Sequence, residues 1–252
     1  MVMIAHASID ENRGIKNGLA GDQTEKEVCI RAWYNKPWGC VIRFNDENMA
    51  EKVAWFMTAA AANDNIGYDQ NQRNTVLTEA RKHNYDASKI TTPCEADCSS
   101  LVSVACMYAG VPESALTLHG NCATTRTLKN ILKSTGEVSI FTTPLYTSNP
   151  DRLKRGDILL KEGSHTAVVV TSGNPYRLTK IAMHIGCKGE SVKWLQWQLN
   201  SFGYKLDIDG DFGPLTKSAV IEYQKSHLDV NGNKLVVDGI AGSKTLGALK
   251  RG

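Results

Sequence analysis

Hydrophobic residues follow helical spacing in the first part of the chain and form short β-branched runs after it. The helical spacing covers residues 47–62, 71–83, 97–108 and 123–133, and the short runs cover residues 138–141, 157–160, 166–171 and 178–184. Helices followed by antiparallel strands are typical of the α+β class. We therefore predict a larger α+β domain over residues 1–183.

One short motif occurs twice near the end of the chain. The residues that recur after 29 positions are Asp209, Gly210, Gly213, Thr216 and Ala219, which return as Asp238, Gly239, Gly242, Thr245 and Ala248. Asp-Gly favours a turn, and the second glycine stands where a helix would begin. Ahead of the motif, residues 190–202 carry apolar side chains on one face of a predicted helix. We predict a small all-helical domain over residues 184–252.

Charge and hydropathy exclude several classes of protein. The 252 residues include 29 Lys and Arg against 26 Asp and Glu, without a block of like charges, which argues against a nucleic-acid binder. The longest apolar stretch, residues 53–62, is too short for a membrane span, so we expect no stable membrane association. The first residues lack the basic and apolar regions of a signal peptide, so we expect synthesis in the cytoplasm.

The seven cysteines do not form a recognisable framework. Their odd number and irregular spacing argue against a set of disulfides. Cys94 and Cys98 could supply two zinc ligands from one helix, but the chain has neither a Cys-x-x-Cys nor a His-x-x-x-His motif. We therefore predict neither a metal nor another cofactor.

Cys98 is the best candidate for a nucleophile. It follows Asp97, which can cap the predicted helix, and it precedes Ser99 and Ser100. A cysteine in the first turn of a helix lies where the helix dipole favours the thiolate, whereas a cysteine further along a helix is usually part of the core. A nucleophilic thiol also needs a base. His165, at the first position of the strand predicted after Ser164, can supply it.

The tail resembles the three-helix peptidoglycan-binding domain of wall hydrolases. The residues that carry this resemblance are the run from Gly186 to Val192, then Leu195, Gln196, Leu199, the run from Asp209 to Gly213, Tyr223, Gln224 and the run from Asp238 to Gly242. The resemblance implies that bacterial peptidoglycan is the partner of this domain.

Three motifs of the larger domain resemble the NlpC-type cysteine peptidases of peptidoglycan, which are small papain-like enzymes. They are the runs from Asp97 to Val102, from Gly156 to Leu160 and from Ser164 to Val170. The resemblance implies a papain-like fold in which Cys98 opens a helix and His165 begins a strand. It also implies that Tyr68 lines the cleft and contacts the substrate.

The resemblance further implies a third polar residue that orients the histidine, and here the chain departs from the family. The usual spacing leads to Arg177, whose cation would disfavour a neighbouring imidazolium. A hairpin that turns at Asn174 and Pro175 would instead place His184 opposite His165. His184 is our first candidate, and Asn174 or another residue remains open.

Together these features predict a hydrolase that cleaves an amide of the peptidoglycan stem peptide. The resemblance favours the bond after D-γ-glutamyl, and the same Cys98–His165 centre could instead act as an N-acetylmuramoyl-L-alanine amidase. A non-catalytic wall-binding protein is the alternative from another class. Without a signal peptide, we expect release through the hole made by a holin, as for a phage endolysin.

Overall fold

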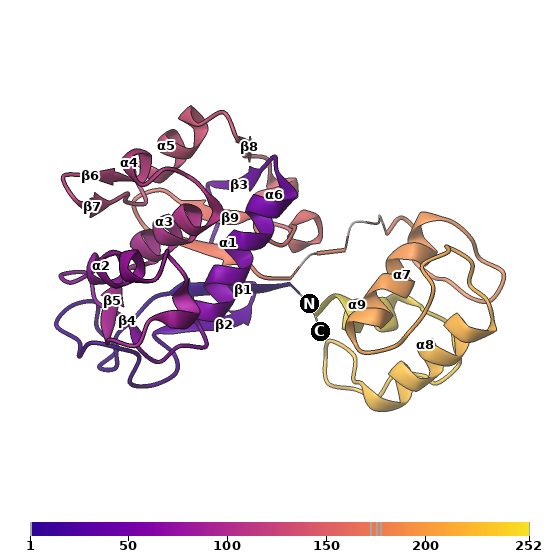
Figure 1. The fold of residues 1–252 in the computed structure, drawn as a ribbon. Coiled ribbons are helices and arrows are strands. Elements are labelled where there is room, and N and C mark those ends of the chain that lie inside the picture. The colour runs from indigo at the N-terminus through magenta and orange to yellow at the C-terminus, as the bar shows by residue number, and fades with distance from the viewer. Residues whose placement is uncertain (1, 172, 175, 177, 252) are drawn as a thin grey trace. The chain divides into compact units, whose positions relative to one another are not determined.

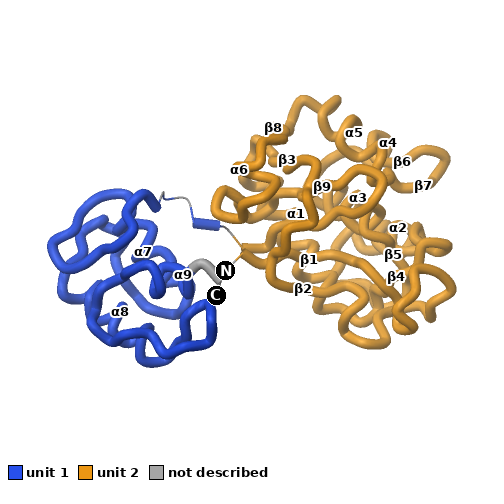
Figure 2. Tube along the Cα trace, turned by 180° about the vertical axis from the view of Figure 1, so that it is seen from behind, with its two compact units in different colours: residues 1, 173–252 blue, residues 2–172 orange. Residues whose placement is uncertain are grey.

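The computed structural model describes residues 2–171, 173–174, 176 and 178–251. These residues form two compact units, one within residues 2–172 and the other within residues 173–252 (Figure 2). Each unit has its own hydrophobic core. Among the described residues, no helix combines the length and the apolar character needed to cross a membrane.

The larger unit is built on one antiparallel sheet with the strand order β2-β1-β10-β9-β3-β8. Its strands are β1 (Met3–Ala7), β2 (Val28–Ala32), β3 (Cys40–Phe44), β8 (Val138–Phe141), β9 (Ile158–Lys161) and β10 (His165–Val169). The first strand along the chain therefore pairs with the last, and Ile4 lies opposite Val169. This pairing gives β10 two neighbours, β1 and β9.

All the helices of this unit lie between β3 and β9 along the chain. They are α1 (Glu47–Ala60), α2 (Thr75–Lys82), α3 (Cys98–Ala109), α4 (Glu113–Leu116), α5 (Leu128–Ser134) and α6 (Pro144–Thr147), with short 3-10 helices at Ala87–Lys89 and Pro150–Arg152. Two small sheets pair β4 (Ile66–Tyr68) with β5 (Cys94–Ala96) in parallel, and β6 (Thr117–Leu118) with β7 (Asn121–Cys122) in antiparallel.

The two faces of the sheet bury different sets of side chains because successive residues of a strand point to opposite faces. Ala5, Ile42 and Val168 face the core that α1 and α3 cover, where these two helices lie side by side (Figure 1). Ile4 and Val169 belong to the core on the other face. We call the face covered by α1 and α3 the helix face. We call the other the aromatic face, because aromatic side chains cover its core, namely Trp38, Trp33, Tyr34 and Tyr146.

The smaller unit contains α7 (Glu190–Ser201), α8 (Pro214–Ser226) and α9 (Ser243–Arg251) around a core that includes Trp194 and Tyr223. The repeated motif makes the same corner twice. Gln196 of α7 donates to Asp209 at 2.7 Å and accepts from the Gly210 N–H at 2.9 Å. Gln224 of α8 repeats this with Asp238 at 3.1 Å and the Gly239 N–H at 2.9 Å. The repetition in the sequence therefore reflects a repetition in the hydrogen bonding.

Most of the predicted elements are present, and one is wrong. Residues 178–184 form no strand, and Met183 is instead buried in the core of the smaller unit, where it pairs with Ala241. The predicted boundary after residue 183 therefore falls inside that unit, which begins at Gly173. The sequence patterns also missed β1, β2 and β3. β1 and β3 are almost fully buried and show no clear alternation of apolar and polar residues.

Candidate active site

Cys98 is the first residue of α3, and its position is fixed by a capping box. The Asp97 carboxylate accepts hydrogen bonds from the N–H groups of Ser99 and Ser100 at 2.9 and 2.7 Å. In return, the Ser100 hydroxyl accepts from the N–H of Asp97 at 2.9 Å. These bonds satisfy donors that a helix start otherwise leaves free. The N–H of Cys98 itself is not among the donors used within the described residues.

Arg73 holds this helix start in place. Its Nε atom donates to the Asp97 carboxylate at 2.6 Å, and one Nη atom donates to the Ser99 hydroxyl at 3.0 Å. The guanidinium also donates to the carbonyls of Cys122 and Ala123 at 3.0 and 2.7 Å. One side chain therefore ties the cap of α3 to the segment after β7.

His165 begins β10, and α3, which begins at Cys98, packs against this strand. The backbone of Thr166, the next residue of the strand, acts to lower the pKa of the Cys98 thiol. The structure therefore brings the two predicted catalytic residues to neighbouring positions, although the hydrogen bonds of the described residues do not include a direct one between them. Thr166 faces the helices, whereas His165 lies on the aromatic face together with Ala167 and Val169.

His6 of β1 is the partner of His165. Its Nδ1 atom lies 2.9 Å from Nε2 of His165, and both imidazoles are buried. The pairing of β1 with β10 brings these residues together from opposite ends of the unit. If His6 accepts from His165 Nε2–H, then Nδ1 of His165 carries a lone pair that can take a proton.

Burial keeps both imidazoles neutral and the thiol protonated. Desolvation lowers the pKa of His165 to about 3 and that of His6 to about 4, with the cations of Arg31 and Lys36 acting in the same direction. Desolvation raises the pKa of the Cys98 thiol to about 12, with a further increase from the Asp97 charge. A neutral histidine can accept the proton of a thiol during nucleophilic attack, and both groups are in the protonation state that this transfer requires.

Aromatic side chains surround the histidine pair. The Trp38 ring stacks on His165 at a centroid distance of 6.1 Å, and Tyr34 lies 6.3 Å from His6. Tyr68 of β4 lies opposite Ala96, two residues before Cys98. Burial raises the pKa of Tyr68 to about 12, and the nearby Cys98 contributes to this increase. Tyr68 therefore keeps its proton and can donate a hydrogen bond from its hydroxyl.

The two candidates for the third polar residue belong to the other unit. The Nδ1 atom of the exposed His184 forms a hydrogen bond with the carbonyl of Ile185 at 3.0 Å. Asn174 is buried and donates to the carbonyl of Trp194 at 2.8 Å. The hairpin that suggested His184 does not form, because β1 takes the place beside β10 that a following strand would have taken. Arg177 and Pro175 lie outside the described residues.

His6 was not identified from the sequence as part of the site. It is one polar residue in the apolar run of β1, and such a histidine is compatible with ordinary burial. The sequence indicates only that a single histidine lies inside a short apolar strand. The partner of that histidine depends on which strand lies next to β1. That neighbour is set by pairing across most of the unit.

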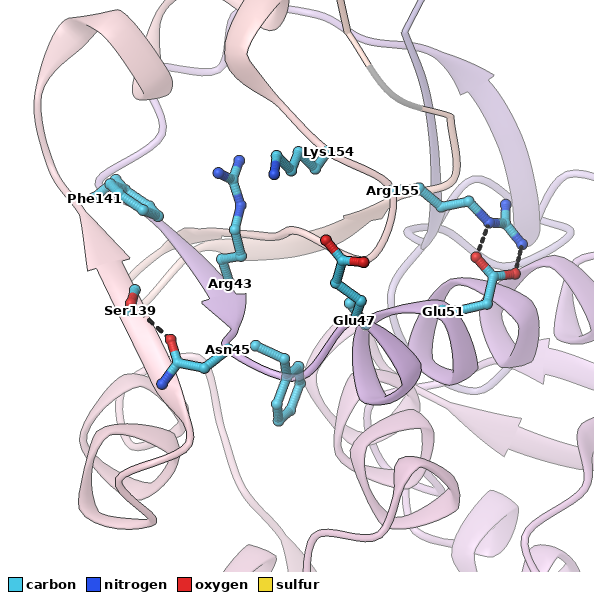
Figure 3. Close-up of a pocket in the computed structure, with 10 residues that line it drawn as sticks. Arg43, Asn45, Glu47, Glu51, Ser139, Phe141, Lys154 and Arg155 are labelled. Carbon is cyan, nitrogen blue, oxygen red and sulfur yellow. Dashed lines mark hydrogen bonds and ion pairs between the residues drawn. The ribbon is translucent and has the colours of Figure 1, made fainter. Parts of the chain in front are cut away.

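A cavity of about 360 Å³ lies elsewhere in the unit (Figure 3). It is formed where β3 ends and β9 begins, whereas His165 pairs with Lys161 at the opposite end of β9. Its cations are largely engaged in structural pairs: Arg155 holds Glu51, and Arg43 binds the buried Asp157 through two hydrogen bonds of 2.6 Å. These ion pairs therefore hold this part of the unit together, and the cavity that they line is separate from the Cys98 site.

Two family models match the chain. Residues 4–176 match the family described as endolysin-like domain, and residues 188–249 match the putative peptidoglycan binding domain. The first match covers more than half of the chain and contains Cys98, His165, His6 and Tyr68. The second covers the three helices of the smaller unit.

Three known proteins share parts of the sequence or structure. A zinc D-Ala-D-Ala carboxypeptidase of Streptomyces albus G is 39% identical over 67 residues, which is 25% of this chain and 24% of that protein. The chain thus matches about a quarter of the length of this curated relative. A Burkholderia AP3 phage endolysin is 40% identical over 28% of this chain and 25% of its own, with a TM-score of 0.25. A peptidoglycan-binding protein from Clostridioides difficile, solved with glutamine hydroxamate, is 22% identical over 72% of this chain and 87% of its own, with a TM-score of 0.26.

Proposed function

Because the chain belongs to the endolysin-like domain family, we propose that it is a peptidoglycan hydrolase that uses Cys98 as nucleophile and His165 as base. The observation that carries the proposal is the arrangement of a capped helix that starts at Cys98 against a strand that starts at His165. A nucleophile at a helix start and a histidine at a strand start are what the resemblance of the sequence motifs to NlpC-type peptidases implies, and this supports the proposal. The match of the smaller unit to a putative peptidoglycan binding domain supports the substrate.

The reaction begins with attack of the Cys98 sulfur on a carbonyl carbon of the stem peptide. A carbon–sulfur bond forms, the thiol proton passes to His165, and the unused N–H of Cys98 is positioned to bind the oxyanion. His165 then protonates the leaving amine as the carbon–nitrogen bond breaks. Water hydrolyses the thioester, with His165 accepting the proton of the water and returning it to the sulfur.

His6 takes the role of the positioning residue. Its hydrogen bond with His165 Nε2 fixes the orientation of the imidazole, and the stacked Trp38 shields this bond from water. Tyr68 contributes a donor at the substrate side of Cys98. The residues that act on the substrate are thus Cys98, His165 and Tyr68, and His6 acts through His165.

The proposal is tested by digestion of purified peptidoglycan with the wild type and with Cys98→Ala. We expect new amino groups on diaminopimelate or lysine by mass spectrometry, which identify cleavage after D-γ-glutamyl. New N-terminal L-alanine would identify the amidase, which the same residues support equally. Equal activity of the two proteins would contradict the role of Cys98, and binding without cleavage by the wild type would favour a non-catalytic wall protein.

The role of His6 is tested by a pair of variants. We expect His6→Leu to lower kcat by about 100-fold with little change in KM, because the imidazole of His165 loses its orientation. His6→Asn should recover a large part of kcat, since its side-chain oxygen can take the place of Nδ1. If both variants lost activity only in proportion to their loss of folded protein in thermal denaturation, His6 would have a purely structural role.

A further inference from the structure

We propose that Arg31 and Lys36 form an anion-binding wall that recognises a substrate carboxylate beside the scissile amide. This inference rests on the proposed function and specifies the substrate class of the same site. The wall is the segment from Arg31 to Trp38, which runs from the end of β2 toward β3 and carries the aromatic residues Trp33, Tyr34 and Trp38.

The register of the sheet places Arg31 on the same face as His6 and His165. Arg31 lies opposite Ile4, and Cys29 lies opposite His6, so all four side chains belong to the aromatic face. The guanidinium carbon of Arg31 lies 4.7 Å from the centre of the Tyr34 ring. That ring lies 6.3 Å from His6 and 5.9 Å from Trp38, which itself stacks on His165. Two aromatic rings therefore separate the Arg31 cation from the base.

The cations of the wall have no carboxylate partner among the described residues, unlike four arginines of the same unit. Arg43, Arg73, Arg81 and Arg155 each hold an aspartate or a glutamate. Among the ion pairs of the described residues, none involves Arg31 or Lys36. Lys36 lies near His165, because its backbone carbonyl accepts a hydrogen bond at 3.4 Å from Lys161, the residue opposite His165. The charges of Arg31 and Lys36 also lower the pKa of His6 and of His165. An unpaired positive potential beside the reacting groups favours an anionic ligand.

The geometry of Arg31 suits a carboxylate. The guanidinium lies over the Tyr34 ring, and none of the hydrogen bonds of the described residues uses its N–H groups. A guanidinium can donate two parallel hydrogen bonds to a carboxylate. The D-glutamyl residue of a stem peptide carries a free α-carboxylate next to its γ-amide. In peptidoglycan whose glutamyl residue is α-amidated, this charge is absent. The wall therefore selects the acidic form of the stem peptide.

The test compares two muramoyl tripeptides, L-Ala–D-γ-Glu–meso-diaminopimelate with a glutamyl α-carboxylate and the same compound with an α-carboxamide. Either proposed scissile bond is present in both. We expect the full-length wild type to prefer the carboxylate by about tenfold or more in kcat/KM, mainly through KM, and to lose this preference at high salt. Arg31→Gln should abolish most of the preference, and Lys36→Gln should reduce it. Lys52→Gln is the control, since it removes an exposed cation from α1 on the helix face.

A second arm measures binding of both compounds to Cys98→Ala by titration calorimetry, with and without Arg31→Gln. Cleavage of neither compound by the wild type would refute the proposed function, and the binding arm would then still decide the role of Arg31. Equal affinities or equal kcat/KM values for the two compounds would overturn the anion-binding wall. So would an Arg31→Gln variant that weakened both compounds by the same factor, because that result would indicate only a structural role.

Discussion

Two buried glutamates near Tyr68, Glu27 and Glu95, differ in the number of hydrogen bonds that their carboxylates accept. This difference decides how much the negative charge of each one destabilises the folded protein. Both oxygens of Glu27 accept backbone N–H groups, from Gln23 and Tyr68, each at 3.0 Å. Glu95 accepts only from Gly21 at 3.0 Å, and its other oxygen has no partner. Burial raises the pKa of both side chains, and that of Glu95 to about 8. The ionised form of Glu95 therefore destabilises the folded protein more than the ionised form of Glu27 does.

We predict that Glu95→Gln stabilises the protein at pH 9 by about 1–3 kcal/mol. The pKa of Glu95 in the folded protein lies above its ordinary value of 4.5. The wild type is therefore most stable below pH 4.5, where Glu95 is protonated, and it loses stability as the pH rises to about 8 and the side chain ionises. A neutral glutamine keeps the bond to Gly21 and removes this loss. The measurement is the free energy of unfolding in urea between pH 5 and pH 9.

Glu27→Gln is the matched control for this prediction. It turns one acceptor into an N–H group that faces a backbone N–H, so it should destabilise the protein by about 1–3 kcal/mol at either pH. A stabilising Glu27→Gln, or a Glu95→Gln whose effect did not grow with pH, would contradict this account of the two glutamates.

At the scale of elements, the start of α3 is the part of the fold on which the proposed chemistry depends. The capping box places Cys98 in the first turn, and Arg73 neutralises the Asp97 carboxylate that makes the box. The Asp97 charge raises the pKa of the thiol, and the Arg73 charge lowers it. Asp97 and Arg73 therefore both affect the pKa of the Cys98 thiol through their charges, and Asp97 also fixes the position of Cys98 by capping the helix.

We predict that Arg73→Gln raises the pKa of the Cys98 thiol, because it leaves the Asp97 charge without its partner. The measurement is the pH dependence of alkylation by iodoacetamide, followed at Cys98 by peptide mapping. The variant should also lose about 2 kcal/mol of stability with its four hydrogen bonds. Arg73→Lys should lose stability while keeping the alkylation profile close to that of the wild type. An unchanged profile in Arg73→Gln would limit Arg73 to a structural role.

At the scale of the whole molecule, each unit closes its own core. The core around Trp194 and Tyr223 contains only residues of the smaller unit, and the two cores of the larger unit contain only residues before 172. The proposed chemistry lies entirely in the larger unit. The match to a putative peptidoglycan binding domain lies entirely in the smaller unit.

We therefore predict that a chain ending at residue 172 cleaves soluble muramoyl peptides with a kcat/KM within about twofold of the full chain, because the removed residues form a separate core. Sedimentation with purified walls should show its affinity reduced by about tenfold or more, since binding through a second domain is lost. A truncated chain that is folded by circular dichroism but inactive on the soluble peptide would place part of the active site after residue 172.

The sequence by itself determined the features that depend on neighbouring residues. Asp97 predicts the start of α3 because capping is a local interaction, and it thereby identifies Cys98. The repeated Asp-Gly corners predict the small helical unit because each corner combines a tight turn with hydrogen bonds to a glutamine of the preceding helix, 13 or 14 residues earlier. Only the tertiary structure decided the partner of His165. His6 reaches it through a pairing of the first and last strands, and the hairpin that favoured His184 depended on a strand that is not formed. Which strand lies beside β10 is a long-range choice made by burial of the whole sheet, and no local pattern encodes it.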